Sequence, residues 1–142
     1  MVLNEWDADN GIAQCIVSDS KNGITIEGFG MATCHENDKA FQSELTGSFI
    51  AQTRAYINIL RNKRDYDIKP GLMALKHVRA TMVHSHNYNP SSYEAKRLSK
   101  EIKNLEDSLH ELNCVIEEEK KMLKEYLNDK DKIYRELEHG QN

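Results

Sequence analysis

The first third of the chain contains two apolar stretches with the length and composition of β-strands. Residues 12–17 form a short run rich in β-branched side chains, and residues 24–29 alternate apolar with small or polar ones. The polar segment between them ends in Asn22-Gly23, a pair favoured in the tight turns of hairpins. This pattern predicts an antiparallel β-hairpin over residues 11–34.

Gly28 and Gly30 flank Phe29 in the second of these predicted strands. Glycine inside a strand marks a bulge or bend, or a place where the backbone comes close to a ligand. A lone G-x-G is weak evidence for a ligand-binding loop. The pattern therefore favours a bulge or bend over close approach to a ligand.

Helical spacing follows the hairpin. Asn37-Asp38 has residue types that begin helices, and the basic segment 61–64 suits the negative end of a helix dipole. Between them, apolar residues recur near the helical period at Phe41, Leu45, Phe49, Ala51, Tyr56, Ile59 and Leu60. We predict a helix that runs to about Leu60 and ends at this basic segment. Gly47 inside it costs about 1 kcal/mol relative to alanine, which indicates close packing on the sheet.

A second helix is predicted to begin at Pro70, because proline fits the first turn of a helix. One apolar stripe runs along it, made by Leu72, Leu75, Val78 and Met82. Residues 84–90 then form a polar loop that contains histidine, asparagine and tyrosine.

The last third of the chain carries a heptad pattern. Pro90 precedes Ser91-Ser92-Tyr93-Glu94, which matches a capping box. Apolar residues then alternate at steps of four and three, with Glu119 and Lys130 as exceptions. These residues, the seam, are Leu98, Ile102, Leu105, Leu109, Leu112, Ile116, Leu123, Tyr126, Ile133 and Leu137. The pattern predicts a helix of about 48 residues, roughly 70 Å long.

A seam of this length needs a surface to pack against. A domain formed by residues 1–90 is too small to cover it, so a helix from a second copy is the simplest partner. A helical hairpin with a break near Asn113-Cys114 is the alternative. We predict an α+β protein, with an antiparallel sheet and helices in a ligand-binding domain (residues 1–90) and a long coiled-coil-type oligomerisation helix (residues 91–142).

The amino-acid composition is consistent with this predicted architecture and narrows the class of protein. The 142 residues are 39% hydrophobic and 30% charged, as in chains that include a long charged helix. The sequence shows neither an apolar membrane span nor a signal peptide. Its three cysteines, Cys15, Cys34 and Cys114, are too widely spaced for a disulfide framework or a zinc site. We expect a soluble intracellular protein with no membrane partner.

Charge is distributed unevenly along the chain. Residues 1–53 have two Lys/Arg and eight Asp/Glu, a net −6; residues 54–97 have nine and three, a net +6; residues 98–142 have eight and twelve, a net −4. This is either ordinary surface variation or a local pocket for a small anion. The overall −4 argues against binding to long nucleic acids.

Catalytic and metal-binding patterns are weak. Cys34 and either His84 or His86 could form a nucleophile and base, and His84-x-His86 is one close pair where zinc needs three or four ligands. No other catalytic or phosphate-loop motif is present. We therefore predict no catalytic residues, no metal and no cofactor.

Ligand binding is the more specific prediction. Tyr88 could stack on a nucleobase, Asn87 and Asn89 could bond to its edge, and arginines could pair with phosphates. The candidate arginines are Arg54, Arg61, Arg79 and Arg97. The residues alone favour the alternative, in which Tyr88 packs on the sheet, the asparagines form turns and the arginines lie at the surface.

Three segments together resemble the first family of phage Thoeris anti-defence proteins. They are residues 28–34, Gly-Phe-Gly-Met-Ala-Thr-Cys; residues 50–55, Ile-Ala-Gln-Thr-Arg-Ala; and residues 87–97, Asn-Tyr-Asn-Pro-Ser-Ser-Tyr-Glu-Ala-Lys-Arg. The resemblance implies a non-enzymatic protein that sequesters cyclic ADP-ribose isomers in the cytoplasm of the bacterial host. It also implies dimers that can assemble into hexamers, and in some members separate sites for cyclic oligonucleotides.

The resemblance places the ligand on a specific set of residues. Tyr88 would stack on adenine, His86, Asn87 and Asn89 would make polar contacts, and phosphates would bind to Arg54, Arg79 and Arg97. Three other functions stay open: an adaptor that acts through its long helix; a small RNA-binding domain, which the negative charge disfavours; and an enzyme that acts on the same nucleotides, for which the sequence shows no machinery.

Overall fold

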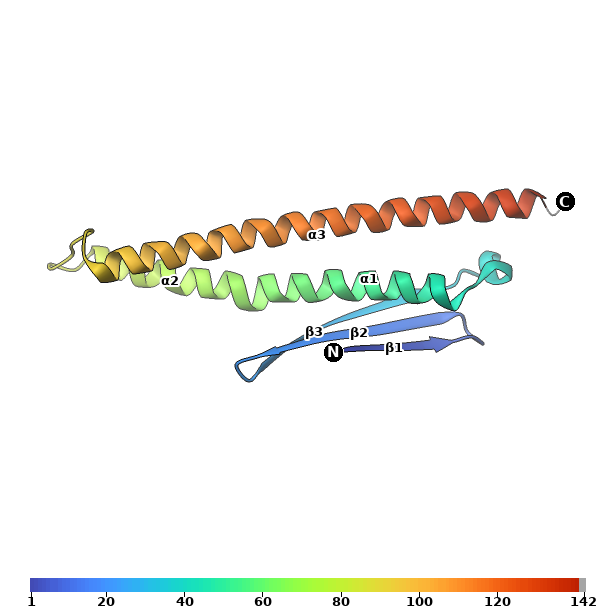
Figure 1. Cartoon of the computed structure of the whole chain (residues 1–142), viewed down its shortest axis with the longest axis horizontal. Helices are drawn as coiled ribbons and strands as arrows, with labels where there is room; N and C mark the ends of the chain where they lie inside the picture. The colour runs from blue at the N-terminus through green and yellow to red at the C-terminus, as the bar shows by residue number, and fades with distance from the viewer. Residues whose placement is uncertain (141–142) are drawn as a thin grey trace. The chain divides into compact units, whose positions relative to one another are not determined.

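The computed structural model of the chain describes residues 1–140 and contains a three-stranded antiparallel sheet followed by helices (Figure 1). It is an α+β protein, as predicted. Two compact units are present: residues 1–61 with the segment from Ile116 on, and Asn62–Val115. These units follow packing and differ from the division at residue 90 expected from the sequence.

The predicted hairpin is confirmed. Strands β2 (Ile12–Lys21) and β3 (Ile24–Thr33) pair antiparallel and are joined at Asn22 and Gly23. Both turn residues have positive φ, 54° and 78°, as a two-residue type I′ turn requires. A third strand, β1 (Val2–Asp7), pairs with β2 at the other edge and was not predicted.

Gly28 and Gly30 are required by helix packing rather than by a bulge. The β2–β3 register is unbroken from Ile12↔Thr33 to Lys21↔Ile24, so the predicted bulge is wrong. A Cβ on Gly30 would overlap backbone atoms of Ala51 and Ala55 in α1 (Glu44–Lys63), and one on Gly28 would overlap Ala55 and Ile59. The sheet and α1 therefore meet almost backbone to backbone.

The predicted helix from residue 37 is interrupted. A 3-10 helix, η1 (Glu36–Phe41), comes first, and α1 then begins after Ser43, whose Oγ accepts a bond from the Thr46 amide at 3.4 Å. The predicted end of this helix at the basic segment 61–64 is confirmed, although the chain stays helical beyond it. α1 continues to Lys63 and is followed directly by the π-helix η2 (Arg64–Ile68) and by α2 (Lys69–Val83).

Helix α2 has Pro70 in its first turn, as predicted. Helix α3 spans Tyr93–Gly140, 48 residues without the alternative break near Asn113. Its cap is Ser92 rather than Ser91, because the Ala95 amide donates to Ser92 Oγ at 3.2 Å. No helix among residues 1–140 has an apolar stretch long enough to cross a bilayer.

Part of the seam is buried or half-buried within the chain itself. In the second unit, Leu98 and Ile102 of α3 form a core with Leu72 of α2. In the first unit, α1 lies between the sheet and α3 (Figure 1), and Leu123 and Tyr126 pack against the core of sheet and α1. The expectation that residues 1–90 could not cover the seam is therefore wrong for these positions.

Candidate functional site

A basic cavity of about 560 Å³ opens in the first unit between β3, α1 and α3. Its lining combines cationic and amide side chains with an apolar floor: Phe29, Gly30, Met31, Arg54, Ile57, Asn58, Arg61, Lys120, Leu123, Lys124, Leu127 and Asn128.

Helical periodicity explains why these residues meet. Arg54, Asn58 and Arg61 lie at steps of four and three and therefore share one face of α1. On α3, Lys120, Lys124 and Asn128 follow steps of four, next to apolar positions of the seam. Each helix thus brings cations to the cavity beside its buried stripe.

The charge of this cavity is entirely positive. Arg54, Arg61, Lys120 and Lys124 line it, and its described lining contains no carboxylate. Lys120 forms an exposed pair with Glu117 at 3.4 Å, which is a weak restraint. Among residues 1–140, neither Arg61 nor Lys124 forms an ion pair, so both can bind an anion without breaking an existing pair.

Two α1 side chains in the cavity protect the free edge of β3. The Asn58 amide donates to the Phe29 carbonyl at 2.6 Å, and Arg54 Nη1 donates to the Met31 carbonyl at 2.7 Å. These carbonyls are two residues apart in the strand and therefore point the same way. Their donors, Arg54 and Asn58, lie one helical turn apart on α1. By bonding to these carbonyls, Arg54 and Asn58 block the addition of another strand at this edge. Arg61 and the two lysines remain as the cations available to a ligand.

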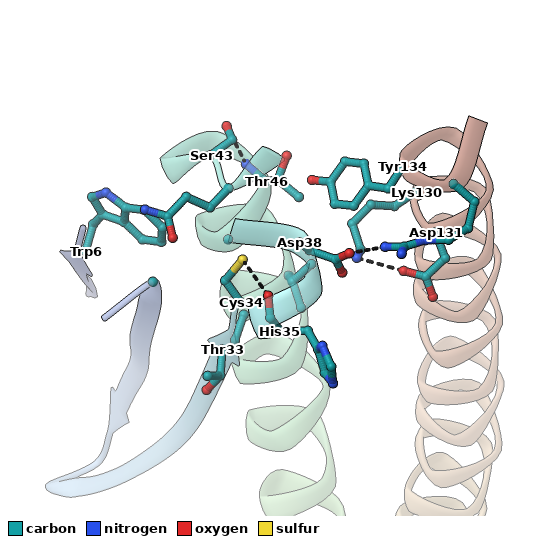
Figure 2. Close-up of a pocket in the computed structure, with 16 residues that line it drawn as sticks. Trp6, Thr33, Cys34, His35, Asp38, Ser43, Thr46, Lys130, Asp131 and Tyr134 are labelled. Atoms are coloured by element: carbon teal, nitrogen blue, oxygen red, sulfur yellow. Dashed lines mark hydrogen bonds and ion pairs between the residues drawn. The ribbon is translucent and has the colours of Figure 1, made fainter. Parts of the chain in front are cut away.

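A second cavity of about 500 Å³ lies elsewhere in the same unit and shares no lining residue with the first. This Trp6 cavity has walls from the sheet, from the start of α1 and from α3 (Figure 2): Trp6, Gly11, Ala32, Thr33, Cys34, His35, Asp38, Gln42, Ser43, Thr46, Gly47, Ile50, Lys130, Asp131, Tyr134 and Arg135. Its lining contains both acidic and basic side chains, and these form ion pairs with one another.

Cys34 in this cavity is poorly suited to act as a nucleophile. Burial raises the pKa of its thiol, and the negative charge of Asp38 raises it further. Its Sγ donates to the His35 carbonyl at 3.6 Å. A nucleophilic cysteine needs a lowered pKa, so the environment acts in the opposite direction. The candidate bases His84 and His86 belong to the second unit.

The predicted ligand residues are divided between the two units. Arg54 lines the basic cavity, whereas Arg79, Arg97 and residues 86–89 belong to the second unit. Residues 86–89 are exposed and line neither of the two cavities described above. Asn89 makes a turn, because its Oδ1 accepts from the Ser91 amide at 3.0 Å, and Arg97 pairs with Glu101 at 3.1 Å.

The lysines of the basic cavity were missed by sequence reasoning. Lys120 and Lys124 lie in a segment of net negative charge, which hid their common face on α3. The heptad exception at Lys130 was a usable signal, because this lysine lines the Trp6 cavity and lies 4.7 Å above the Tyr134 ring. A charged residue at a seam position can mark a cavity.

No three His, Cys, Asp or Glu side chains within residues 1–140 converge to hold a metal ion. Comparison of the chain with protein-family models, curated proteins and solved structures gives no match.

Proposed function

We propose that this protein binds a cyclic ADP-ribose-type nucleotide in the basic cavity and sequesters it without cleaving it. The observation that carries the proposal is the set of four cations without a carboxylate in the described lining. The whole chain has a net charge of −4, so positive charge concentrated in one cavity suits a small anion.

The cavity matches the chemistry of such a ligand. Arg61 and Lys124 would bind the two phosphates, because arginine and lysine form strong charge-assisted hydrogen bonds to phosphate oxygens. The adenine would pack on the apolar floor at Ile57 and Leu127, and Asn128 would bond to its edge. A volume of about 560 Å³ lies within the usual range for small-molecule sites.

The lining also favours binding over hydrolysis. It contains no histidine, cysteine, serine, aspartate or glutamate among the described residues, and so lacks the usual general acids and bases. Sequestration requires an affinity that competes with the receptor of the signal. We expect a nanomolar dissociation constant, about −12 kcal/mol. Such a protein would act in the cytoplasm of the infected bacterium.

Calorimetric titration of the full chain with glycocyclic ADP-ribose isomers tests the proposal. The bound nucleotide is then recovered after heat denaturation and compared with the input by chromatography. We expect tight binding and an unchanged nucleotide. Absence of binding would exclude the proposed function and favour an adaptor, and recovery of an altered nucleotide would establish an enzyme.

Matched variants locate the site. Arg61→Met and Lys124→Met should each weaken binding at least about tenfold, because each removes a charged hydrogen bond worth about 1.5–3 kcal/mol. Arg79→Met, the same change at an exposed position of α2, should have no effect. Loss of binding in Tyr88→Ala but not in Arg61→Met would keep the function and move the site to loop 84–90.

A further inference from the structure

The walls of the Trp6 cavity combine aromatic side chains with small residues. Trp6 lies half-buried on the face of β1 toward α1, and Gly47 faces it from the start of α1. A Cβ at position 47 would lie 3.0 Å from the indole ring. Tyr134 enters from α3 on the other side (Figure 2). The Tyr134 ring stacks on Phe41 with centroids 5.1 Å apart and has Lys130 over it. The indole of Trp6 and the small residues beside it therefore provide the apolar surface for a planar ligand.

The charges of the Trp6 cavity are already matched. Asp38, only 8% exposed, pairs with Arg135, and Lys130 pairs with Asp131 at 2.9 Å (Figure 2). A charged ligand would have to break one of these pairs, and an unpaired buried carboxylate such as Asp38 is costly. The cavity therefore favours an uncharged ligand, in contrast with the basic cavity.

Hydrogen-bonding groups nevertheless remain available in the lining. Ser43 Oγ accepts from the Thr46 amide, so its hydroxyl proton is free to donate. The Tyr134 hydroxyl donates to the Phe41 carbonyl at 3.3 Å, and its oxygen can still accept a hydrogen bond from a ligand. Thr46 adds a third hydroxyl. A heteroaromatic ring with donors and acceptors on its edge would satisfy these groups.

We propose that the Trp6 cavity binds an uncharged heteroaromatic ring of about purine size. The volume of about 500 Å³ accommodates such a ring with room to spare. This site is distinct from the proposed nucleotide site, since the two cavities have no lining residue in common.

Trp6 itself provides the measurement, because it is the only tryptophan of the chain. Titration of the full chain with adenine, excited at the red edge of indole absorption, should change its fluorescence in a saturable way. Adenosine monophosphate carries the same ring with a dianion and should bind no more tightly than adenine. Tighter binding of the monophosphate, or no saturable change with adenine, would overturn the proposal.

Variants assign the signal to the cavity. Thr46→Val keeps the shape of the side chain and should raise the dissociation constant for adenine about fivefold, and Tyr134→Leu should raise it at least tenfold. Tyr66→Leu makes the same change at an exposed position of the second unit and should leave it unchanged. Adenine binding that survives both cavity variants would exclude this site. Calorimetry with the cyclic nucleotide tests the basic cavity separately.

Discussion

Arg54 donates from Nη1 to the backbone carbonyl of Met31 over 2.7 Å and so connects α1 to the edge of the sheet. The sequence predicted Arg54 as a phosphate ligand, and the structure does place it in the basic cavity. Part of its hydrogen-bonding capacity is already used by the protein. Arg54 and Arg61, seven residues apart on one face of α1, should therefore respond differently to substitution.

Arg54→Met should lower the free energy of unfolding by about 1 kcal/mol, because the Met31 carbonyl loses its partner. Arg61→Met should change it by less than about 0.5 kcal/mol, since Arg61 forms no ion pair within residues 1–140. Urea denaturation followed by circular dichroism measures both. Equal destabilisation by the two variants would contradict the assignment of different roles.

Gly30→Ala should destabilise the protein by about 3 kcal/mol, because the new Cβ would overlap the backbone of α1 at Ala51 and Ala55. Gly71→Ala is the matched control. Its nearest neighbour, Leu105 Cδ1, would lie 3.8 Å away, and alanine favours helix, so this variant should be as stable as the parent or more stable. Thermal unfolding of both variants tests the close sheet–helix contact.

These glycines show how far a sequence pattern can lead. The hairpin was predictable because Asn22-Gly23 and the alternation around it are local signals. The role of Gly28 and Gly30 was not, because a bulge and a close helix contact require the same residue type. β1 was missed because its six residues form an edge strand and include Glu5 and Asp7. The end of α1 at the basic segment was predictable, but the π-helix that follows it was not, because residues 64–68 remain helical despite their charge.

Ile102→Ala should cost about 2–5 kcal/mol, because Ile102 is 2% exposed in the core with Leu72 and Leu98. Leu137→Ala should cost less than about 1 kcal/mol in a single chain, since Leu137 is 49% exposed. A coiled coil between two copies would instead make both positions important. Denaturation at two protein concentrations, with sedimentation analysis, distinguishes these cases and tests the predicted homo-oligomer.

The cysteines should differ in reactivity. Burial raises the pKa of the Cys15 and Cys34 thiols, whereas Cys114 is exposed. A raised pKa means less thiolate at a given pH, so iodoacetamide at pH 8 should modify Cys114 before Cys34 and Cys15. Peptide mapping by mass spectrometry gives the order, and unfolding in urea should equalise the rates. Faster reaction at Cys34 than at Cys114 would indicate an activated thiol.

The candidate site was less predictable than the fold. Arg54 was found because it lies in a basic segment, whereas Lys120 and Lys124 lie in an acidic one and meet it only through packing of α3. Loop 84–90 has residue types suited to a nucleobase, yet the structure leaves these residues exposed. A one-dimensional pattern records chemistry along the chain, while a cavity depends on contacts between distant segments.

The division of the chain into units has a consequence for its synthesis. The second unit is one continuous segment, Asn62–Val115, and all the residues of its core have been made once Val115 has left the ribosome. The first unit contains residues 1–61, which are made before the second unit, but its core is also covered by Leu123 and Tyr126, which are made after it. Domains often fold in the order of synthesis. Part of the apolar surface of the sheet and α1 therefore stays uncovered until Leu123 and Tyr126 have followed the second unit out of the ribosome.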